Sequence, residues 1–246
     1  MLNDPLLRLA LGAGAGLLVG SFIGALTWRW PRGDSILHGR SRCDACGTTL
    51  GPLELVPVLG VLWQRGRCRH CGARISLRHT GIELAAALVA GLAPALVPGW
   101  TGVALAGFGL MLLTLAILDA EHFWLPDALT LPLLALGLAL GPPPLAERLW
   151  GAGLGFLTLW LLALAYRALR GREGMGGGDP RLLAAIGAWT GWMALPFVLL
   201  GASLLGLLLA GLDRLRGRPV ATDTALPLGT LMALAAWPVA LMQFAS

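Results

Sequence analysis

Charged residues are scarce in this sequence of 246 residues, and lysine is absent altogether. Asp, Glu and Arg together make up 13% of the chain, which is about half the share found in an ordinary globular domain. Hydrophobic residues make up 57%, and the mean hydropathy is +0.75. These values nearly exclude a soluble enzyme. They also exclude an intrinsically disordered chain, which needs low hydrophobicity and high charge.

Cysteine and glycine patterns exclude two further classes of protein. Four cysteines in a chain of this length are too sparse for a disulfide-stapled secreted domain. The 35 glycines follow no strict three-residue period, so the chain is not collagen-like. The remaining class is an all-α polytopic membrane protein.

Hydropathy predicts about eight transmembrane helices. A helix needs about 20 apolar residues to cross a bilayer, and several of the predicted stretches are shorter, which implies local thinning or helices that stop short of one interface. If Arg181 and Arg214 lie on the same side of the membrane, residues 182–212 must form a hairpin that turns near Pro196. The apolar stretches lie at 6–28, 82–98, 101–118, 128–141, 149–166, 182–195, 197–212 and 225–243.

The arginines predict the orientation of these helices. With eight crossings, sixteen of the eighteen arginines fall on one side of the membrane, and only Arg8 and Arg148 fall on the other. Because arginines in short loops stay in the cytoplasm, both termini are expected outside it. The formal net charge of +5 is thus explained by topology, and we expect no nucleic-acid partner.

All four cysteines lie in one polar insertion, residues 29–80, as two C-x-x-C pairs that are each followed by glycine. Such tight turns let both sulfurs of a pair reach one ion, and two of them at this spacing are typical of a structural four-thiolate zinc site. Disulfides or a redox pair are the alternatives, although a cytoplasmic location argues against stable disulfides. His70 is either a substitute ligand or an exposed loop residue. The cysteines are Cys43, Cys46, Cys68 and Cys71.

Two aspartates are candidates for chemistry at the cytoplasmic boundary. Asp119 follows an unbroken apolar run, so it lies at the end of a spanning helix, where a carboxylate opposes the helix dipole. Asp179 follows a glycine-rich run that lacks the Gly-Lys-Ser/Thr end of a P-loop. It opens the sixth span, where it could instead be only a helix cap with Pro180 at the first helical position. The topology places both aspartates at the same boundary.

Two carboxyl groups brought close together cannot both ionise cheaply and would share one proton. The ionised group can take a proton from water, while the protonated group donates to the scissile carbonyl oxygen. This is aspartyl protease chemistry. The neighbouring groups have simpler predicted roles, because Asp127 can cap the next helix, and Glu121 and His122 are most simply interfacial.

Several motifs occur in an order that covers nearly the whole chain. They are Gly20-Ser21-Phe22, the paired cysteine knuckles, Leu118-Asp119-Ala120 with Leu125-Pro126-Asp127, and the run Gly174-Met175-Gly176-Gly177-Gly178-Asp179. In this order they resemble the type IV prepilin leader peptidases, a group within the G-x-G-D intramembrane aspartyl proteases. Gly24, Leu55, Pro180-Arg181 and the segment Pro227-Leu228-Gly229-Thr230 depart from the residues usual in that family.

The resemblance implies a function. It implies an endopeptidase of the inner membrane that cuts the basic leader from type IV prepilins or type II secretion pseudopilins at the cytoplasmic face, with the pilus or secretion machinery as partner. Asp119 and Asp179 would be the catalytic pair, and the surrounding active-site loop would contain Gly174, Gly176, Gly178 and Arg181.

The family also suggests a second activity and a division of the chain. Many members N-methylate the new terminus from S-adenosylmethionine, and the cysteine-bearing insertion is associated with that step. The residues that would bind this cofactor are not identified by the sequence. The implied parts are a first transmembrane helix at 1–28, a cytoplasmic four-cysteine domain at 29–80 and a membrane aspartyl peptidase core at 81–246.

Two other classes of function compete with a peptidase. In a non-catalytic scaffold of a pilus or secretion assembly, the zinc domain would dock a protein and both aspartates would be helix caps. A transporter would place ionisable residues near the middle of the bilayer, whereas the candidates here lie at its edges. The choice between a pilin and a pseudopilin substrate stays open.

Overall fold

Helices dominate the computed structural model, which describes residues 4–35, 41–43, 45–171, 175–217 and 226–245. Within these ranges the only extended pairings are two isolated β-bridges, so the predicted all-α class is confirmed. The chain divides into two compact units, Met1–Pro98 and Gly99–Ser246. Each unit is described by itself. The predicted division at residues 28 and 80 stays a prediction.

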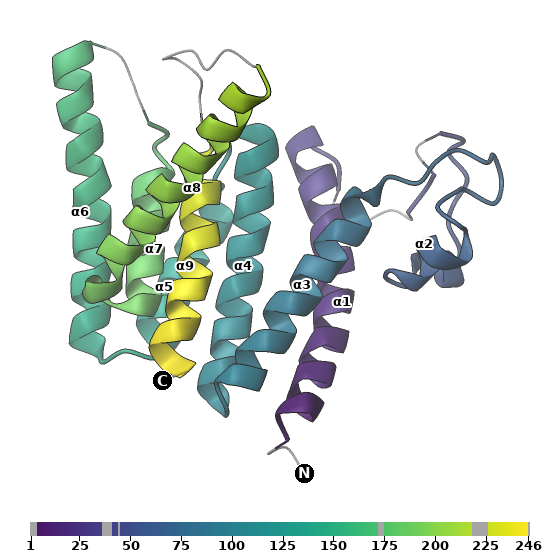
Figure 1. Cartoon of the computed structure of the whole chain (residues 1–246), viewed down its shortest axis with the longest axis horizontal. Coiled ribbons are helices and arrows are strands. Elements are labelled where there is room, and N and C mark those ends of the chain that lie inside the picture. Colours follow the sequence, from purple (N-terminus) through teal and green to yellow (C-terminus); the bar gives the residue numbers. More distant parts are fainter. Residues whose placement is uncertain (1–3, 36–40, 44, 172–174, 218–225, 246) are drawn as a thin grey trace. The chain divides into compact units, whose positions relative to one another are not determined.

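The first unit is built on two long helices, α1 (Pro5–Arg29) and α3 (Leu77–Leu96), which pack against each other. Glycine allows their close approach, because a Cβ at Gly20 of α1 would lie 2.8 Å from the Cα of Glu83 on α3. Between them the chain forms the cysteine-bearing insertion, with the short helix α2 (Leu59–Trp63). Figure 1 shows α2 and its loops beside the pair of long helices.

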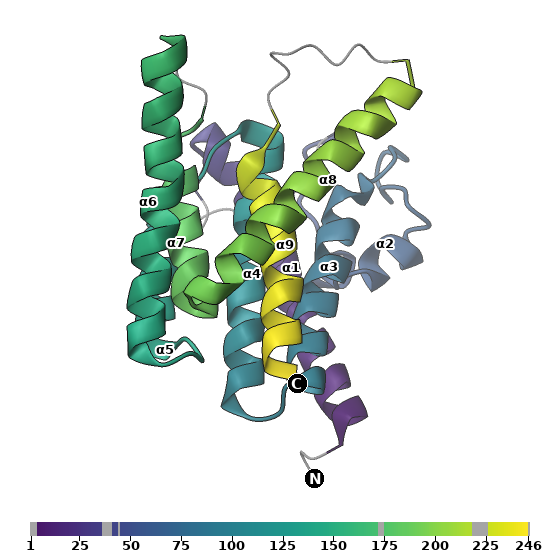
Figure 2. The same cartoon turned by 60° about the vertical axis from the view of Figure 1, so that its left-hand side comes forward.

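The second unit contains six helices within its described residues, and they alternate in direction (Figures 1 and 2). The C-terminal ends of α4, α6 and α8 therefore lie at the same end of the unit as the N-terminal ends of α5, α7 and α9. The helices are α4 (Trp100–His122), α5 (Asp127–Leu140), α6 (Leu145–Arg170), α7 (Asp179–Thr190), α8 (Leu195–Leu215) and α9 (Leu228–Ala245).

Helix α7 is the core of this unit. Every residue of it except Arg181 is buried, and it packs mainly against α6, α5 and α9. Near its C-terminal end, the Trp189 indole N–H donates to the carbonyl oxygen of Leu133, and its ring stacks on Phe108 of α4 at 5.0 Å. A glycine admits the closest contact, since a Cβ at Gly151 of α6 would lie 2.1 Å from the Gly187 carbonyl oxygen. The packing fixes α7 on three sides.

Six of the helices are long and apolar enough to cross a membrane: α1 with its 3-10 extension, α3, α4, α6, α8 with the turn before it, and α9. Helices α5 and α7 overlap the other two predicted stretches but have only 14 and 12 residues. At about 1.5 Å per residue, α7 spans roughly 18 Å, well short of a hydrocarbon core of about 30 Å. The predicted number of eight spans is thus approximate. Of the two short helices, α7 is enclosed by its neighbours, whereas α5 leaves much of its surface exposed.

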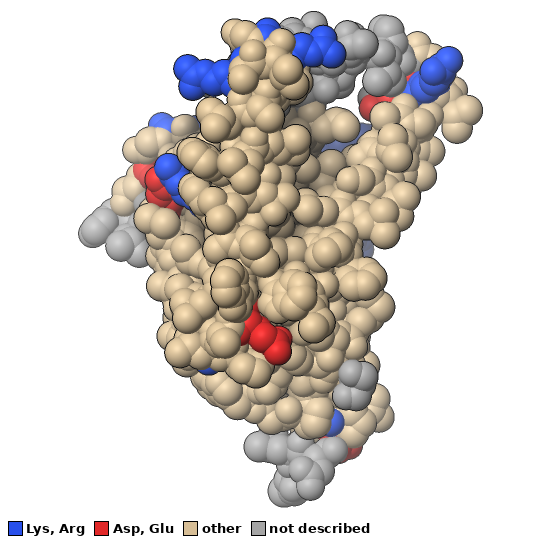
Figure 3. Space-filling view, turned by 90° about the vertical axis from the view of Figure 1, so that its left-hand side faces the viewer, with Lys and Arg blue, Asp and Glu red and all other residues tan. Residues whose placement is uncertain are grey.

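The outer surface of the second unit suits lipid rather than water. Helices α6 and α8 leave many leucines exposed, among them Leu161, Leu164, Leu204 and Leu207. Figure 3 shows a face almost without charge, with arginines gathered at one end. Arg167, Arg170 and Arg214 lie there, in the last turns of α6 and α8. An exposed apolar area of this extent marks a membrane-embedded surface.

Candidate functional site

Asp119 lies in the last turn of α4 and is only 5% exposed. The helix continues to His122, four residues beyond the predicted end, and stops where Phe123 adopts the left-handed conformation with φ +50°. The Phe123 N–H donates to the Asp119 carbonyl oxygen at 2.8 Å. The carboxyl group is therefore held on a rigid element at the arginine-rich end of the unit.

Thr230, near the start of α9, holds this carboxyl group in place. The Thr230 backbone N–H donates to Asp119 Oδ2 at 2.7 Å, and its hydroxyl lies 3.0 Å from the same oxygen. The hydroxyl also lies 2.9 Å from the Ala116 carbonyl oxygen. Sequence reasoning did not single out Thr230 as a partner of Asp119. The available signal was its position in the segment Pro227-Leu228-Gly229-Thr230.

Asp179 is the first residue of α7 and is 7% exposed. The N-cap residue is Gly178, so Asp179 lies one position inside the helix. Its carboxylate accepts a hydrogen bond from the Gly176 backbone instead. The simple capping role, which was the alternative on sequence grounds, is thus not the one its side chain plays.

The structure brings Asp119 and Asp179 close enough to interact electrostatically. Burial, and after it the negative charge of Asp119, raises the pKa of Asp179 to about 6. Two segments next to the pair, the loop before Asp179 and the start of α9, both pack on Leu125. A Cβ at Gly178 would lie 2.7 Å from Leu125 Cβ, and a Cβ at Gly229 would lie 2.8 Å from its Cδ1. Leu125 therefore contacts both the loop before Asp179 and the start of α9.

The remaining loop residues of the prediction have different environments. Gly174 lies outside the described residues, Gly176 is exposed beside Asp179, and Gly178 is packed on Leu125. Arg181 forms an ion pair with Asp127 of α5. The predicted cap at Asp127 is wrong, because Pro126 is the N-cap residue and Asp127 is already helical. Its carboxylate is drawn to Arg181 on a helix that is distant in sequence.

The raised pKa of Asp179 predicts how stability depends on pH. The folded protein holds this proton more tightly than the unfolded chain, whose aspartates titrate near 3.8. The free energy of unfolding should therefore fall as pH rises from about 4 to about 6, by at most about 3 kcal/mol, and then level off. Asp179→Asn should remove this fall and raise the unfolding temperature of the detergent-solubilised chain at neutral pH.

The matched control is Asp127→Asn, which removes a half-exposed carboxylate one helix away. It should leave the decline between these pH values intact. The measurement is the thermal unfolding of the wild type and both variants between about pH 4 and pH 6. If Asp179→Asn shows the same decline as the wild type, the burial and charge coupling of Asp179 are refuted.

The four cysteines form two turns with the same hydrogen-bond pattern. In the first, the Cys43 N–H donates to the Thr48 carbonyl oxygen and the Gly47 N–H donates to the Cys43 carbonyl oxygen. The second repeats this arrangement with Cys68, Ala73 and Gly72. Gly47 and Gly72 have φ of +71° and +72°, which explains the glycine after each pair.

The sulfur atoms converge on one point that fits a metal ion. All four Sγ atoms lie within 4.8 Å of one another, and those of Cys43 and Cys71 are 3.9 Å apart. A tetrahedral Zn–S distance of about 2.3 Å requires sulfurs about 3.8 Å apart. No disulfide joins the four cysteines, and His70 is exposed outside the cluster.

Two family models match the chain, and together they follow its two units. The bacterial peptidase A24 N-terminal domain matches residues 15–96, and the type IV leader peptidase family matches residues 106–211. No solved structure gives a significant match.

Curated relatives are similar over most of their length. A prepilin leader peptidase/N-methyltransferase of Aeromonas salmonicida is 44% identical over 82% of this chain and 71% of the relative. Proteins of the same description from Burkholderia pseudomallei and Pseudomonas putida are 39% and 36% identical, over 92% and 95% of this chain and 83% and 90% of those relatives.

Proposed function

Because the chain belongs to the type IV leader peptidase family, we propose that it is an aspartic endopeptidase of the inner membrane. Its substrates are type IV prepilins or type II secretion pseudopilins, from which it removes the basic leader at the cytoplasmic face. The single observation that supports this most is the pair of buried carboxyl groups, Asp119 and Asp179, at the arginine-rich end of one unit.

The environments of the two carboxyl groups suggest their separate roles. Asp179 keeps its proton to a higher pH than an ordinary aspartate, so it is the acid that donates to the scissile carbonyl oxygen. Asp119 accepts hydrogen bonds from Thr230 and is the better placed partner for the negative charge. It takes a proton from the attacking water, whose oxygen adds to the carbonyl carbon. Collapse of the tetrahedral intermediate then releases the new amino terminus.

The loop before α7 is the proposed substrate contact. Gly176 is exposed and has no side chain beside Asp179, so an extended peptide backbone can approach the carboxyl group closely there, whereas Gly178 is packed on Leu125. Gly174 belongs to the same proposed loop, whereas Arg181 lies in the first turn of α7. Arg181 is already paired with Asp127, and we assign it the role of holding α7 against α5 when the leader binds.

The first unit supports the second activity, N-methylation of the new terminus. The cysteine cluster is proposed to bind one structural zinc ion through Cys43, Cys46, Cys68 and Cys71, because their sulfurs fit a tetrahedral ion and leave no open position. Zinc would supply rigidity to the insertion and no chemistry. The methyl donor is S-adenosylmethionine. The distribution of the arginines supports the proposal that both termini lie outside the cytoplasm.

A reconstituted assay tests this function. The full chain in detergent is incubated with a panel of purified prepilins and pseudopilins, with and without S-adenosylmethionine, and the products are identified by mass spectrometry. We expect removal of the leader without the cofactor, and a further added methyl group with it. A protein that binds these precursors but leaves every leader intact would instead be an assembly scaffold.

A further inference from the structure

The short helix α2 of the first unit turns its apolar side chains outward. Leu59, Leu62 and Trp63 lie three and four residues apart, so they share one face of the helix, and all three are exposed. On the opposite face Gly60 is buried, and Gln64, which caps the C-terminal end, is only 8% exposed. A surface helix in water has the reverse arrangement, with its polar side chains outward. The exposed face of α2 therefore suits an apolar surrounding.

The chain before α2 extends this apolar surface. Leu53 and Leu55 of the 3-10 turn η2 (Pro52–Leu55) are also exposed. We refer to the five side chains together as the α2 apolar surface: Leu53, Leu55, Leu59, Leu62 and Trp63. Single exposed leucines are ordinary, but a group of this size in one short segment marks a contact with a membrane or with another protein. The position of α2 along the long helices decides between the two.

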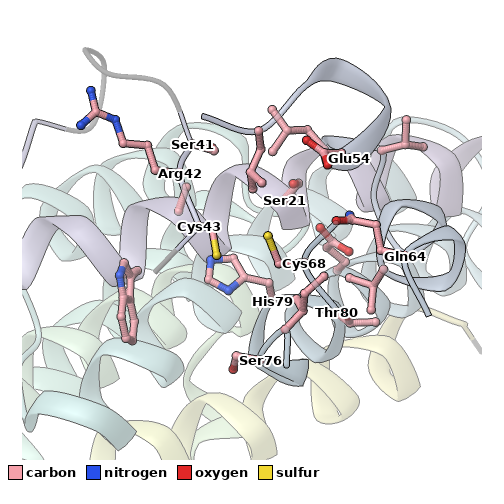
Figure 4. Close-up of a pocket in the computed structure, with 18 of the residues that line it drawn as sticks. Ser21, Ser41, Arg42, Cys43, Glu54, Gln64, Cys68, Ser76, His79 and Thr80 are labelled. Carbon is pink, nitrogen blue, oxygen red and sulfur yellow. The ribbon is translucent and has the colours of Figure 1, made fainter. Parts of the chain in front are cut away.

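Two features fix the level of α2 along the long helices. The backbone N–H of Val58, directly before α2, donates to Glu83 Oε2 of α3 at 2.8 Å. Gln64 lines a cavity that Ser21 of α1 lines as well, as Figure 4 shows. Glu83 lies six residues after the start of α3, and Ser21 lies eight residues before the end of α1. At about 1.5 Å per residue, α2 is therefore about 9–12 Å inward from the helix ends that carry the insertion.

A bilayer that α3 crosses reaches this level. Beyond Glu83, α3 carries no charged residue from Leu84 to its end at Leu96. This apolar part is about 20 Å long, whereas the hydrocarbon core of a bilayer is about 30 Å thick. The core therefore extends to the level of Glu83 even where the membrane is locally thinned. Lipid is thus the surrounding that the level of α2 favours over a soluble partner protein.

Arginines follow the apolar surface directly. Arg65 and Arg67 come after α2, and an isolated antiparallel β-bridge sets Arg67 opposite Arg74. All three are exposed. Two like charges at opposed positions of such a bridge repel each other, so an anion beside them is favourable. Residues 29–80 contain nine arginines and three acidic residues, and the anionic headgroups of a leaflet supply the opposite charge.

We propose that α2 is an interfacial anchor of the first unit. Its apolar surface lies among the acyl chains at the membrane boundary, and Arg65, Arg67 and Arg74 contact the phosphates of anionic headgroups. Apolar area and electrostatic attraction are the two terms that hold such segments on a bilayer. The cysteine-bearing insertion is then seated on the membrane surface and is not a domain suspended in water. This contact does not depend on the proposed peptidase or methylation chemistry.

Photo-crosslinking of the full chain in lipid nanodiscs identifies what covers α2. The amino acid p-benzoylphenylalanine replaces Leu62, and intact-mass spectrometry after illumination distinguishes a lipid adduct from a cross-link to protein. We expect lipid adducts at a yield within a few fold of that from the same probe at Leu88, an exposed residue of α3. The matched control is the probe at His70, an exposed polar position in the second knuckle, which should give several fold less lipid adduct than Leu62.

The lipid composition tests the arginines. Nanodiscs that contain phosphatidylglycerol should give several fold more adduct at Leu62 than nanodiscs of phosphatidylcholine alone, and Arg67→Gln with Arg74→Gln should abolish this difference. Equal yields in both lipids with the arginines intact overturn the headgroup contact. Cross-links to protein at Leu62, or as little lipid adduct there as at His70, overturn the anchor while Leu88 still labels lipid. An unchanged unfolding temperature in detergent shows that each variant is folded.

Discussion

Asp119→Asn and Asp179→Asn should each abolish leader cleavage, with a loss of at least about 10²–10⁴-fold in rate. Asparagine has nearly the shape of aspartate but can neither take a proton from water nor hold one for donation. Thr230 can still donate to the amide oxygen of the Asp119→Asn variant, so the fold should survive. Asp179→Asn should fold at least as well as the wild type, because it removes a buried charge. The measurement is the initial rate of cleavage of a purified prepilin.

Two neighbouring carboxyl groups supply the controls. Glu121→Gln changes an exposed residue two positions after Asp119. Asp127→Asn breaks the half-exposed pair with Arg181, and such pairs contribute about 1 kcal/mol or less. Both variants should cleave at rates within a few fold of the wild type. Wild-type cleavage by either Asp119→Asn or Asp179→Asn would remove that residue from the chemistry and favour the scaffold.

Replacing any one of the four cysteines by serine should release the metal. We expect about one zinc ion per wild-type chain and close to none in Cys43→Ser or Cys68→Ser. Binding of a structural zinc ion contributes about 10–16 kcal/mol in small zinc domains, so its loss should disorder the insertion. Methylation should then disappear, whereas cleavage should persist, because Asp119 and Asp179 belong to the other unit. Metal analysis of fresh protein and mass spectrometry of the product measure both effects.

His70→Ala is the matched control for the metal, because His70 lies inside the second knuckle but outside the cluster. It should keep its ion and its methylation. A wild-type chain without metal, and with reactive thiols at all four positions, would show that the cluster is a set of free cysteines. Loss of cleavage together with the metal would show that the two activities are not separable in the way proposed here.

The helices themselves were predictable because apolar runs in a membrane protein have a clear physical meaning. Each of the eight stretches coincides mainly with one α-helix, although the ends of the helices differ from the predicted ends by up to five residues. Hydropathy could not tell that α7 is enclosed by neighbours. A stretch that is apolar all round looks the same when it faces lipid and when it faces protein.

The site was predictable in its charged residues and not in their partners. Asp119, Asp179 and the cysteines stand out because charged residues and thiols are rare in a chain this apolar. Thr230 is 111 residues from Asp119, and no local pattern links them. Asp127 was predicted to cap its own helix because capping depends only on neighbouring residues. Its ion pair with Arg181 depends on the packing of α7 against α5, which the local sequence does not specify.

The central claim is that Asp119 and Asp179 meet, and cross-linking tests it most directly. In a chain whose four native cysteines are replaced by serine, the pair Asp119→Cys and Asp179→Cys is treated with a short thiol-specific cross-linker and mapped by mass spectrometry. Asp119→Cys with Thr230→Cys is the positive control, and Asp119→Cys with Glu147→Cys, in the first turn of α6, is the negative one. We predict that the first two pairs cross-link and the third does not. Cross-linking of the Thr230 pair alone would contradict the account.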